Sequence, residues 1–251
     1  MGANSLSLFP EARSQFPGVE LPPGVWHAPG ALSLAEQESV VADLRERLKE
    51  APFFRPYMPE RPGSPASGVP FSVRMTNLGP LGWVSERRGA RYQPVHPKTQ
   101  QPWPPIPDFL LGLWQRFTLP YWQEAGRGSA PLPPPDCCLV NWYSEDAHMG
   151  LHRDNGEAAR ELPIVSLSLG RSATFRIADP DDGRTQDPNG RIHKVRLNSG
   201  DIIAFGGASR LSLHGVPRLL KLRQPGNRGT GTDPLDLGGR LNLTLRRITP
   251  A

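Results

Sequence analysis

The segment Arg240-Leu-Asn-Leu-Thr-Leu-Arg246, close to the end of the 251-residue chain, decides the fold class. Its apolar and polar residues alternate, which predicts a β-strand with one apolar and one polar face that runs on to Ile248. Six shorter β-rich runs precede it, with turn residues between most of them: Cys137–Tyr143, Ile164–Leu169, Ala173–Ile177, Lys194–Leu197, Asp201–Phe205 and Leu211–Val216. Many short strands separated by turns are typical of a β-sandwich or barrel.

Two helices are expected before these strands. Ser33-x-x-Glu36 is a capping-box pattern, after which apolar residues recur every four positions until Pro52 ends the helix. Asp108 is expected to cap a second helix with a similar apolar face. Because the helices precede the strands, we expect them to pack on one sheet, giving a mainly β fold with flanking helices, of the α+β class.

The chain also divides by composition. Residues 1–31 are rich in Pro, Gly and Ser, and we expect them to form an extended arm along the body of the protein or to be partly disordered. Residues 32–251 are expected to form a single domain whose β core spans 136–251. Within it, residues 52–69 contain five prolines and are expected to form a loop, and residues 71–75 alternate like a strand.

The charge and the cysteine content bear on the cellular compartment and on the class of binding partner. The net charge of +5 suits a polyanionic partner such as nucleic acid, although a basic surface without a special partner has the same charge. The two cysteines, Cys137 and Cys138, are adjacent and cannot form a disulfide framework. No signal pattern or membrane-spanning run is apparent, so we expect a cytoplasmic monomer with no membrane partner.

Three residues have the order of a metal site. His152 and Asp154 lie two apart, so on an extended segment their side chains point the same way, and His214 follows 60 residues after Asp154. Two histidines and one carboxylate form the facial triad of non-haem iron(II) enzymes, which leaves open positions for a cosubstrate and oxygen. With six histidines in the chain, this spacing alone is also compatible with coincidence.

The polar face of the last strand strengthens the metal hypothesis. If that face lies inside the β body, the guanidiniums of Arg240 and Arg246 can bind a dicarboxylate. If it lies in water, the segment is an ordinary half-exposed strand. Asn141 and Tyr143 share a face of another strand and are candidates for further hydrogen bonds to the same acid.

Trp83 is a candidate for contact with a nucleic-acid base. It lies in a Gly- and Arg-rich stretch, which we expect to be a flexible loop, and an aromatic ring in such a setting can stack on a base. The alternative is that Trp83 covers part of the core.

Taken together, the motifs resemble the AlkB family of iron(II)- and 2-oxoglutarate-dependent dioxygenases, in particular its bacterial DNA-repair members. The resemblance runs from about Met75 to Arg247. It rests on the order and spacing of these motifs: Met75-Thr-Asn-x-Gly79, Leu81-Gly-Trp83, Pro102-Trp103-Pro104, Asn141-x-Tyr143, Leu151-His-x-Asp154, Pro163-Ile-Val-Ser-x-Ser-Leu-Gly170, Gly200-Asp201, Gly206-Gly207, His214-Gly215 and Arg240-x-Asn-Leu-Thr-x-Arg246.

The resemblance implies a role for each matching residue. His152, Asp154 and His214 match the iron ligands. Matches to 2-oxoglutarate contacts are Asn141, Tyr143, Arg240, Asn242 and Arg246, with Arg240 at the distal carboxylate. Matches to substrate contacts are Trp83, which stacks on the damaged base, and the lid residues Met75 and Tyr92.

The implied fold is a double-stranded β-helix, or jelly roll, with a nucleotide-recognition lid at about residues 53–95. The implied reaction is oxidative demethylation of N-alkylated bases in DNA. Oxygen and 2-oxoglutarate give succinate and carbon dioxide, and the hydroxylated methyl group leaves as formaldehyde. The base must leave the helical stack to react, which favours single strands.

One position departs from the family pattern. The bacterial members have an aspartate two residues after the iron-binding aspartate, where it reads the exocyclic amine of the base; this chain has Gly156. Asn155 or Glu157 is a candidate to replace it, and Arg184, in a long loop, is a further candidate substrate contact. RNA, protein or lipid substrates are alternatives, as is a non-catalytic jelly-roll binding protein, although all five iron and arginine positions are intact.

Overall fold

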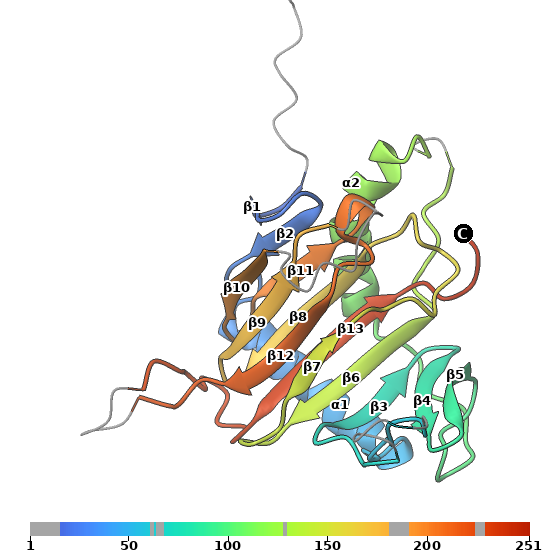
Figure 1. The fold of residues 1–251 in the computed structure, drawn as a ribbon, viewed down its shortest axis with the longest axis vertical. Helices are drawn as coiled ribbons and strands as arrows, with labels where there is room; N and C mark the ends of the chain where they lie inside the picture. Colours follow the sequence, from blue (N-terminus) through green and yellow to red (C-terminus); the bar gives the residue numbers. More distant parts are fainter. Residues whose placement is uncertain (1–15, 61–62, 64–67, 128–129, 181–190, 224–228) are drawn as a thin grey trace, which may run out of the picture.

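Eight strands after residue 136 form two antiparallel sheets that face each other in the computed structural model (Figure 1). The structure describes residues 16–60, 63, 68–127, 130–180, 191–223 and 229–251. The strands are β6 (Cys137–Tyr143), β7 (Met149–His152), β8 (Ile164–Gly170), β9 (Ala173–Ala178), β10 (Ile192–Leu197), β11 (Ile202–Phe205), β12 (His214–Leu219) and β13 (Arg240–Arg246). A 3-10 turn, η1 (Gly207–Ser209), precedes β12.

The two sheets differ in width. The larger has the order β1-β2-β11-β8-β13-β6-β3, in which β1 (Val19–Glu20), β2 (Val25–Ala28) and β3 (Arg74–Leu78) extend the jelly roll at both edges. The smaller has the order β10-β9-β12-β7. Because β6, β8, β11 and β13 alternate along the chain with strands of the smaller sheet, the core is the expected double-stranded β-helix.

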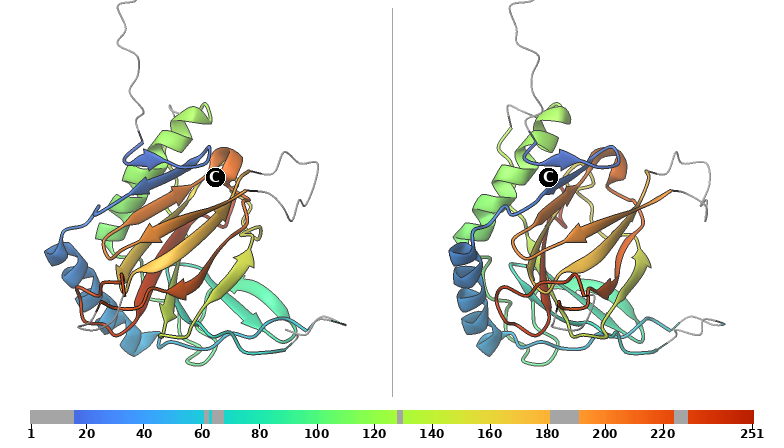
Figure 2. Two further views of the ribbon diagram at one scale, coloured as in Figure 1. Left: turned by 60° about the vertical axis from the view of Figure 1, so that its left-hand side comes forward. Right: turned by 90° about the vertical axis from the view of Figure 1, so that its left-hand side faces the viewer.

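Both helices cover the outer face of the larger sheet (Figure 2). They are α1 (Leu34–Glu50) and α2 (Asp108–Glu124). The capping box predicted at Ser33 and Glu36 is present. The inward residues of both helices form one apolar cluster with one face of the sheet, including Leu241, Leu243 and Leu245. Among the described residues, no helix is long and apolar enough to cross a membrane.

The last strand is buried on both faces, which fixes where its polar residues point. Its leucines pack under the helices, so the polar alternate residues face the space between the two sheets. Arg240 is completely buried and Arg246 is 4% exposed. The interpretation of this segment as a half-exposed strand is therefore wrong, and the interpretation with its polar face inside the β body is confirmed.

Several boundaries differ from the sequence prediction. The strand expected at residues 71–75 is β3, from Arg74 to Leu78, and the strand expected at 211–216 begins only at His214. The stretch around Trp83 is a β-hairpin, β4 (Gly82–Glu86) and β5 (Gly89–Gln93), and was wrongly expected to be a flexible loop. The N-cap position of α2 is Pro107, so Asp108, the predicted cap, is instead the first residue of the helix.

Candidate active site

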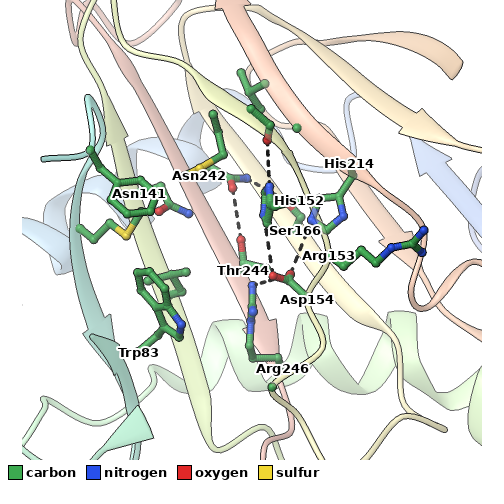
Figure 3. A pocket seen from close by; sticks show the side chains of 18 of the residues that line it. Trp83, Asn141, His152, Arg153, Asp154, Ser166, His214, Asn242, Thr244 and Arg246 are labelled. Atoms are coloured by element: carbon green, nitrogen blue, oxygen red, sulfur yellow. Dashed lines mark hydrogen bonds and ion pairs between the residues drawn. The ribbon is translucent and has the colours of Figure 1, made fainter. Parts of the chain in front are cut away.

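A cavity of about 820 Å³ opens between the two sheets and is bounded on one side by the β4–β5 hairpin. Its lining includes all the predicted iron and cosubstrate residues together with Trp83, Tyr92 and Met75. Figure 3 shows the Trp83 indole across the cavity from His152, Asp154 and His214. The fold thus brings together residues that are far apart in the sequence.

The two histidines and the aspartate converge on one point. His152 ends β7 and His214 begins β12, where they are paired across the ladder with ring centroids 4.4 Å apart. The Asp154 carboxylate lies between them: its Oδ1 is 3.7 Å from His152 Nε2, and its Oδ2 is 3.6 Å from His214 Nε2. One ligand atom from each residue lies within 4.8 Å of the others, which is a spacing that one metal ion can span.

Hydrogen bonds orient both imidazole rings for metal binding. Nδ1 of His152 donates to the Gly150 carbonyl oxygen and Nδ1 of His214 to the Ser212 carbonyl oxygen, each over 3.0 Å. A donating Nδ1–H leaves the lone pair on Nε2, the atom that faces Asp154. Metal-binding histidines usually have this arrangement. With one carboxylate and two such nitrogens, the donor set fits iron(II).

The protonation states also suit a cation. Burial opposes ionisation of Asp154, but the Arg246 guanidinium and the two histidines outweigh it and hold the pKa of Asp154 well below its usual range. Desolvation and the neighbouring His214 ring lower the pKa of His152. At neutral pH the site therefore offers an ionised carboxylate and a neutral His152 imidazole, the forms that bind metals.

Arg240 is a buried cation whose hydrogen-bonding capacity is largely unused. Its Nη2 donates to Ser168 Oγ over 2.7 Å, whereas its Nε and Nη1 have no partner among the described residues. Burial lowers the pKa of Arg240 to about 10, so it remains charged at neutral pH. An unpaired buried guanidinium facing a cavity fits the binding of a ligand carboxylate.

Two predicted neighbours of Arg240 line the same cavity. Tyr143 is directly opposite Arg240 in the β6–β13 ladder, and burial raises the pKa of its phenol to about 12. The buried Oδ1 of Asn141 also has no hydrogen-bond partner among the described residues. These groups add polar atoms at the cosubstrate end of the cavity.

Arg246, at the other end of β13, forms ion pairs within the protein. Its Nη2 lies 3.0 Å from Asp154 Oδ2 and its Nη1 lies 2.8 Å from Glu157 Oε1 (Figure 3 shows the first pair). Its Nε has no partner among the described residues. Arg246 therefore lies beside the candidate iron site, whereas Arg240 marks the far end of the same strand.

Asn242 lies between the two arginines, and its amide group already has partners. Its Nδ2 donates to Ser166 Oγ over 2.7 Å and to the Leu167 carbonyl oxygen, and its Oδ1 accepts from Thr244. No role was predicted for Ser166, Ser168 or Thr244, although all three fall on alternating positions of buried strands. Their alternating positions were the sequence feature that could have predicted that they face the cavity.

The hairpin presents Trp83 to the cavity in a fixed position. Trp83 pairs directly with Tyr92 across the two strands. Its backbone N–H and carbonyl oxygen are both hydrogen-bonded to the Asn77 side chain over 3.0 Å, and Phe71 packs edge-on against its ring. Trp83 is thus held as one wall of the cavity.

The residues after Asp154 differ in their accessibility. Asn155 and Gly156 are exposed at the cavity, and a Cβ atom added to Gly156 would lie 3.4 Å from the Tyr92 ring. Glu157 is only 3% exposed and interacts with Tyr92, Arg246 and Arg210. Arg210 was not singled out from the sequence, because nothing in the local pattern marks it. Arg184 lies outside the described residues.

Comparison with known proteins identifies the family. Residues 24–246 match the 2OG-Fe(II) oxygenase superfamily. A Caulobacter vibrioides protein named alpha-ketoglutarate-dependent dioxygenase AlkB homolog is 38% identical over 251 residues, covering 100% of this chain and 97% of that protein. The Escherichia coli alpha-ketoglutarate-dependent dioxygenase AlkB is 34% identical over 217 residues, covering 86% of each chain.

A solved structure agrees with these relatives. The structure described as that of OsALKBH1 superimposes with a TM-score of 0.67 at 29% identity, covering 92% of this chain and all of that chain. The jelly roll, the convergent histidines and aspartate, and the full-length similarity lead to one conclusion. The chain belongs to the 2OG-Fe(II) oxygenase superfamily, and within it to the AlkB group of iron(II)- and 2-oxoglutarate-dependent dioxygenases.

Proposed function

We propose that this dioxygenase demethylates N-alkylated bases in nucleic acid, with single-stranded DNA as its preferred substrate. The observation that carries the proposal is that one cavity combines the required groups. His152, Asp154, His214 and Arg240, whose Nε and Nη1 have no partner among the described residues, lie on the jelly roll, and Trp83 lies opposite them on the hairpin. A base that stacks on Trp83 would therefore lie opposite the metal site.

In this proposal the metal supplies the redox chemistry, and the side chains bind and orient the metal, the cosubstrate and the base. Bound iron(II) supplies oxygen activation, while 2-oxoglutarate is oxidised to succinate and carbon dioxide. His152, Asp154 and His214 hold the metal. Arg240 pairs with the distal carboxylate of 2-oxoglutarate, and Asn141 and Tyr143 offer hydrogen bonds to the same acid. Trp83 holds the base outside its helical stack, which orients the N-methyl group towards the metal.

Mass spectrometry of methylated oligonucleotides tests this function. A panel of methylated DNA and RNA strands, single and double, is incubated with the enzyme, iron(II), ascorbate and 2-oxoglutarate. The expected result is loss of the mass of one methylene unit from single-stranded DNA, with release of formaldehyde. If RNA reacts faster than DNA, the DNA preference is wrong, and if no strand changes mass, the nucleic-acid proposal is wrong.

Trp83→Ala is expected to weaken binding of a methylated oligonucleotide by roughly ten- to a hundredfold, because a base–aromatic stack contributes about 1–3 kcal/mol. Fluorescence anisotropy measures this change. Decay of 2-oxoglutarate without substrate should persist, since Trp83 lies across the cavity from His152, Asp154 and His214. Undiminished binding would show that the base does not stack on Trp83.

The setting we propose is a reducing cytoplasm, with the enzyme acting as a monomer. Cys137 and Cys138 are free, buried thiols, and burial raises the pKa of Cys137 to about 12, so it stays protonated and unreactive. The proposed nucleotide-recognition lid is the region of about residues 53–95, of which the β4–β5 hairpin, together with Met58, Pro59, Phe71 and Met75, lines the cavity.

A further inference from the structure

The Glu157 carboxylate contacts side chains from both the β4–β5 hairpin and the last strand, β13. Its Oε1 accepts a 2.7 Å hydrogen bond from the Tyr92 hydroxyl of the hairpin and lies 2.8 Å from Arg246 Nη1 on the last strand. Arg246 Nη1 is also 3.4 Å from the Tyr92 hydroxyl. Tyr92, Glu157 and Arg246 therefore form a closed triangle of contacts between the hairpin and the jelly roll.

The triangle is buried and its charges are balanced. The side chains of Glu157 and Arg246 are 1% and 5% exposed. Arg210 adds a second cation, with its Nη2 3.4 Å from Glu157 Oε2 and its Nη1 donating to the Asp154 carbonyl oxygen. Two guanidiniums thus face the carboxylates of Glu157 and Asp154. In such surroundings the positions of the charged groups depend strongly on one another, because little solvent screens them.

This burial changes the role to be expected of Glu157. Its Oε1 accepts hydrogen bonds from Tyr92 and Arg246. Its Oε2 has no hydrogen-bond partner among the described residues, but it is buried 3.4 Å from Arg210 Nη2, so the carboxylate is turned towards cations inside the protein. Its partners instead belong to two different sites. Tyr92 is paired with Trp83 on the hairpin that borders the base pocket, and Arg246 lies beside Asp154 at the metal end.

We propose that Glu157 is a positioning residue that holds Arg246 in place for 2-oxoglutarate and couples cosubstrate binding to the hairpin through Tyr92. A base stacked on Trp83 contacts the hairpin next to Tyr92, whose hydroxyl is bonded to Glu157 and through it to Arg246. Substrate and cosubstrate that both stabilise this set of contacts strengthen each other's binding reciprocally. The coupling, but not the positioning of Arg246, rests on the proposed function.

The test uses Tyr92→Phe, which removes one hydroxyl and keeps the aromatic ring. Calorimetry gives the dissociation constant of 2-oxoglutarate for the full-length protein loaded with manganese(II) in the absence of oxygen, with and without a methylated oligonucleotide. Without the oligonucleotide, the variant is expected to bind 2-oxoglutarate about three- to tenfold more weakly, because Glu157 has lost one of its hydrogen-bond donors. The oligonucleotide is expected to tighten 2-oxoglutarate binding at least about fivefold in the parent protein and hardly at all in the variant.

Glu86→Gln is the matched control, because it changes a carboxylate on the same hairpin that pairs only at the surface with Arg91. It should retain the parent behaviour in both measurements. An unchanged 2-oxoglutarate affinity in Tyr92→Phe would overturn the positioning role, whatever the substrate is. Equal tightening by the oligonucleotide in Tyr92→Phe and the parent would overturn the coupling. Failure of the nucleic-acid proposal is seen separately, as absence of oligonucleotide binding while the cosubstrate effect persists.

Discussion

Replacement of Asp154 by alanine is expected to lower 2-oxoglutarate turnover by at least about a hundredfold, since loss of even an outer partner of a metal ligand costs 10- to 100-fold. Asp154 is the only carboxylate in the three-residue cluster found among the described residues, and it lies between the two histidine Nε2 atoms. Its removal leaves the metal with two neutral ligands. Succinate production measures turnover, and equilibrium dialysis with manganese(II) measures metal affinity.

A second variant separates metal loss from misfolding. Asp154 also pairs with Arg246, so Asp154→Ala has a structural cost, whereas the half-exposed His152 ring bonds only to the Gly150 carbonyl oxygen and faces Asp154. His152→Ala is expected to lose turnover and metal affinity to a similar degree while keeping its melting temperature within a few degrees. His148→Ala, an exposed histidine just before β7, is the control and should behave like the parent. Normal turnover in His152→Ala would remove His152 from the ligand set.

Replacement of Arg240 by methionine is expected to change cosubstrate affinity and stability in opposite directions. The 2-oxoglutarate concentration needed for half-maximal turnover should rise on the order of a hundredfold or more, because truncation of a buried charged partner costs about 2–5 kcal/mol. In the absence of 2-oxoglutarate the melting temperature should rise, since an apolar side chain replaces a buried cation that has no carboxylate partner among the described residues.

The sign of the stability effect follows from the pKa of Arg240. Burial lowers that pKa to about 10, which means that the folded state disfavours the charged form relative to the unfolded chain. The cost is fully present below pH 10, so it operates at neutral pH and methionine removes it. Arg218→Met, at an exposed position of β12, is the control for loss of a guanidinium. An unchanged 2-oxoglutarate requirement in Arg240→Met would contradict the proposed role of Arg240.

The sequence predicted most of the strands that are rich in apolar, β-forming residues and missed those that are short or contain glycine. The bounds expected for Cys137–Tyr143 were confirmed, and the last strand begins as predicted at Arg240 and ends two residues short of Ile248. The hairpin around Trp83 was missed because its Gly and Arg residues are more common in loops, and β7 was missed because it has only four residues, one of them Gly150. In both cases pairing with neighbouring chain segments overrides a weak local preference.

The site was predictable to the extent that single residues identify its chemistry. His152, Asp154 and His214 have a recognisable order, and the fold brings their ligand atoms together. The environment of Glu157 was not predictable, because it depends on Arg210 and Tyr92, which lie 53 and 65 residues away along the chain. The sequence offered Glu157 as a reader of the base, and only the fold reveals that it is buried.

The position of β2 has a consequence for the solubility of the protein. β2 pairs with β11, a strand made of Ile202, Ile203, Ala204 and Phe205, all of them buried. A chain shortened to begin after residue 30 would expose this apolar strand and its backbone hydrogen-bonding groups, which is the kind of edge at which proteins aggregate. The N-terminal segment thus protects the sheet from self-association, and its loss would reduce the yield of soluble enzyme while leaving every catalytic residue in the chain.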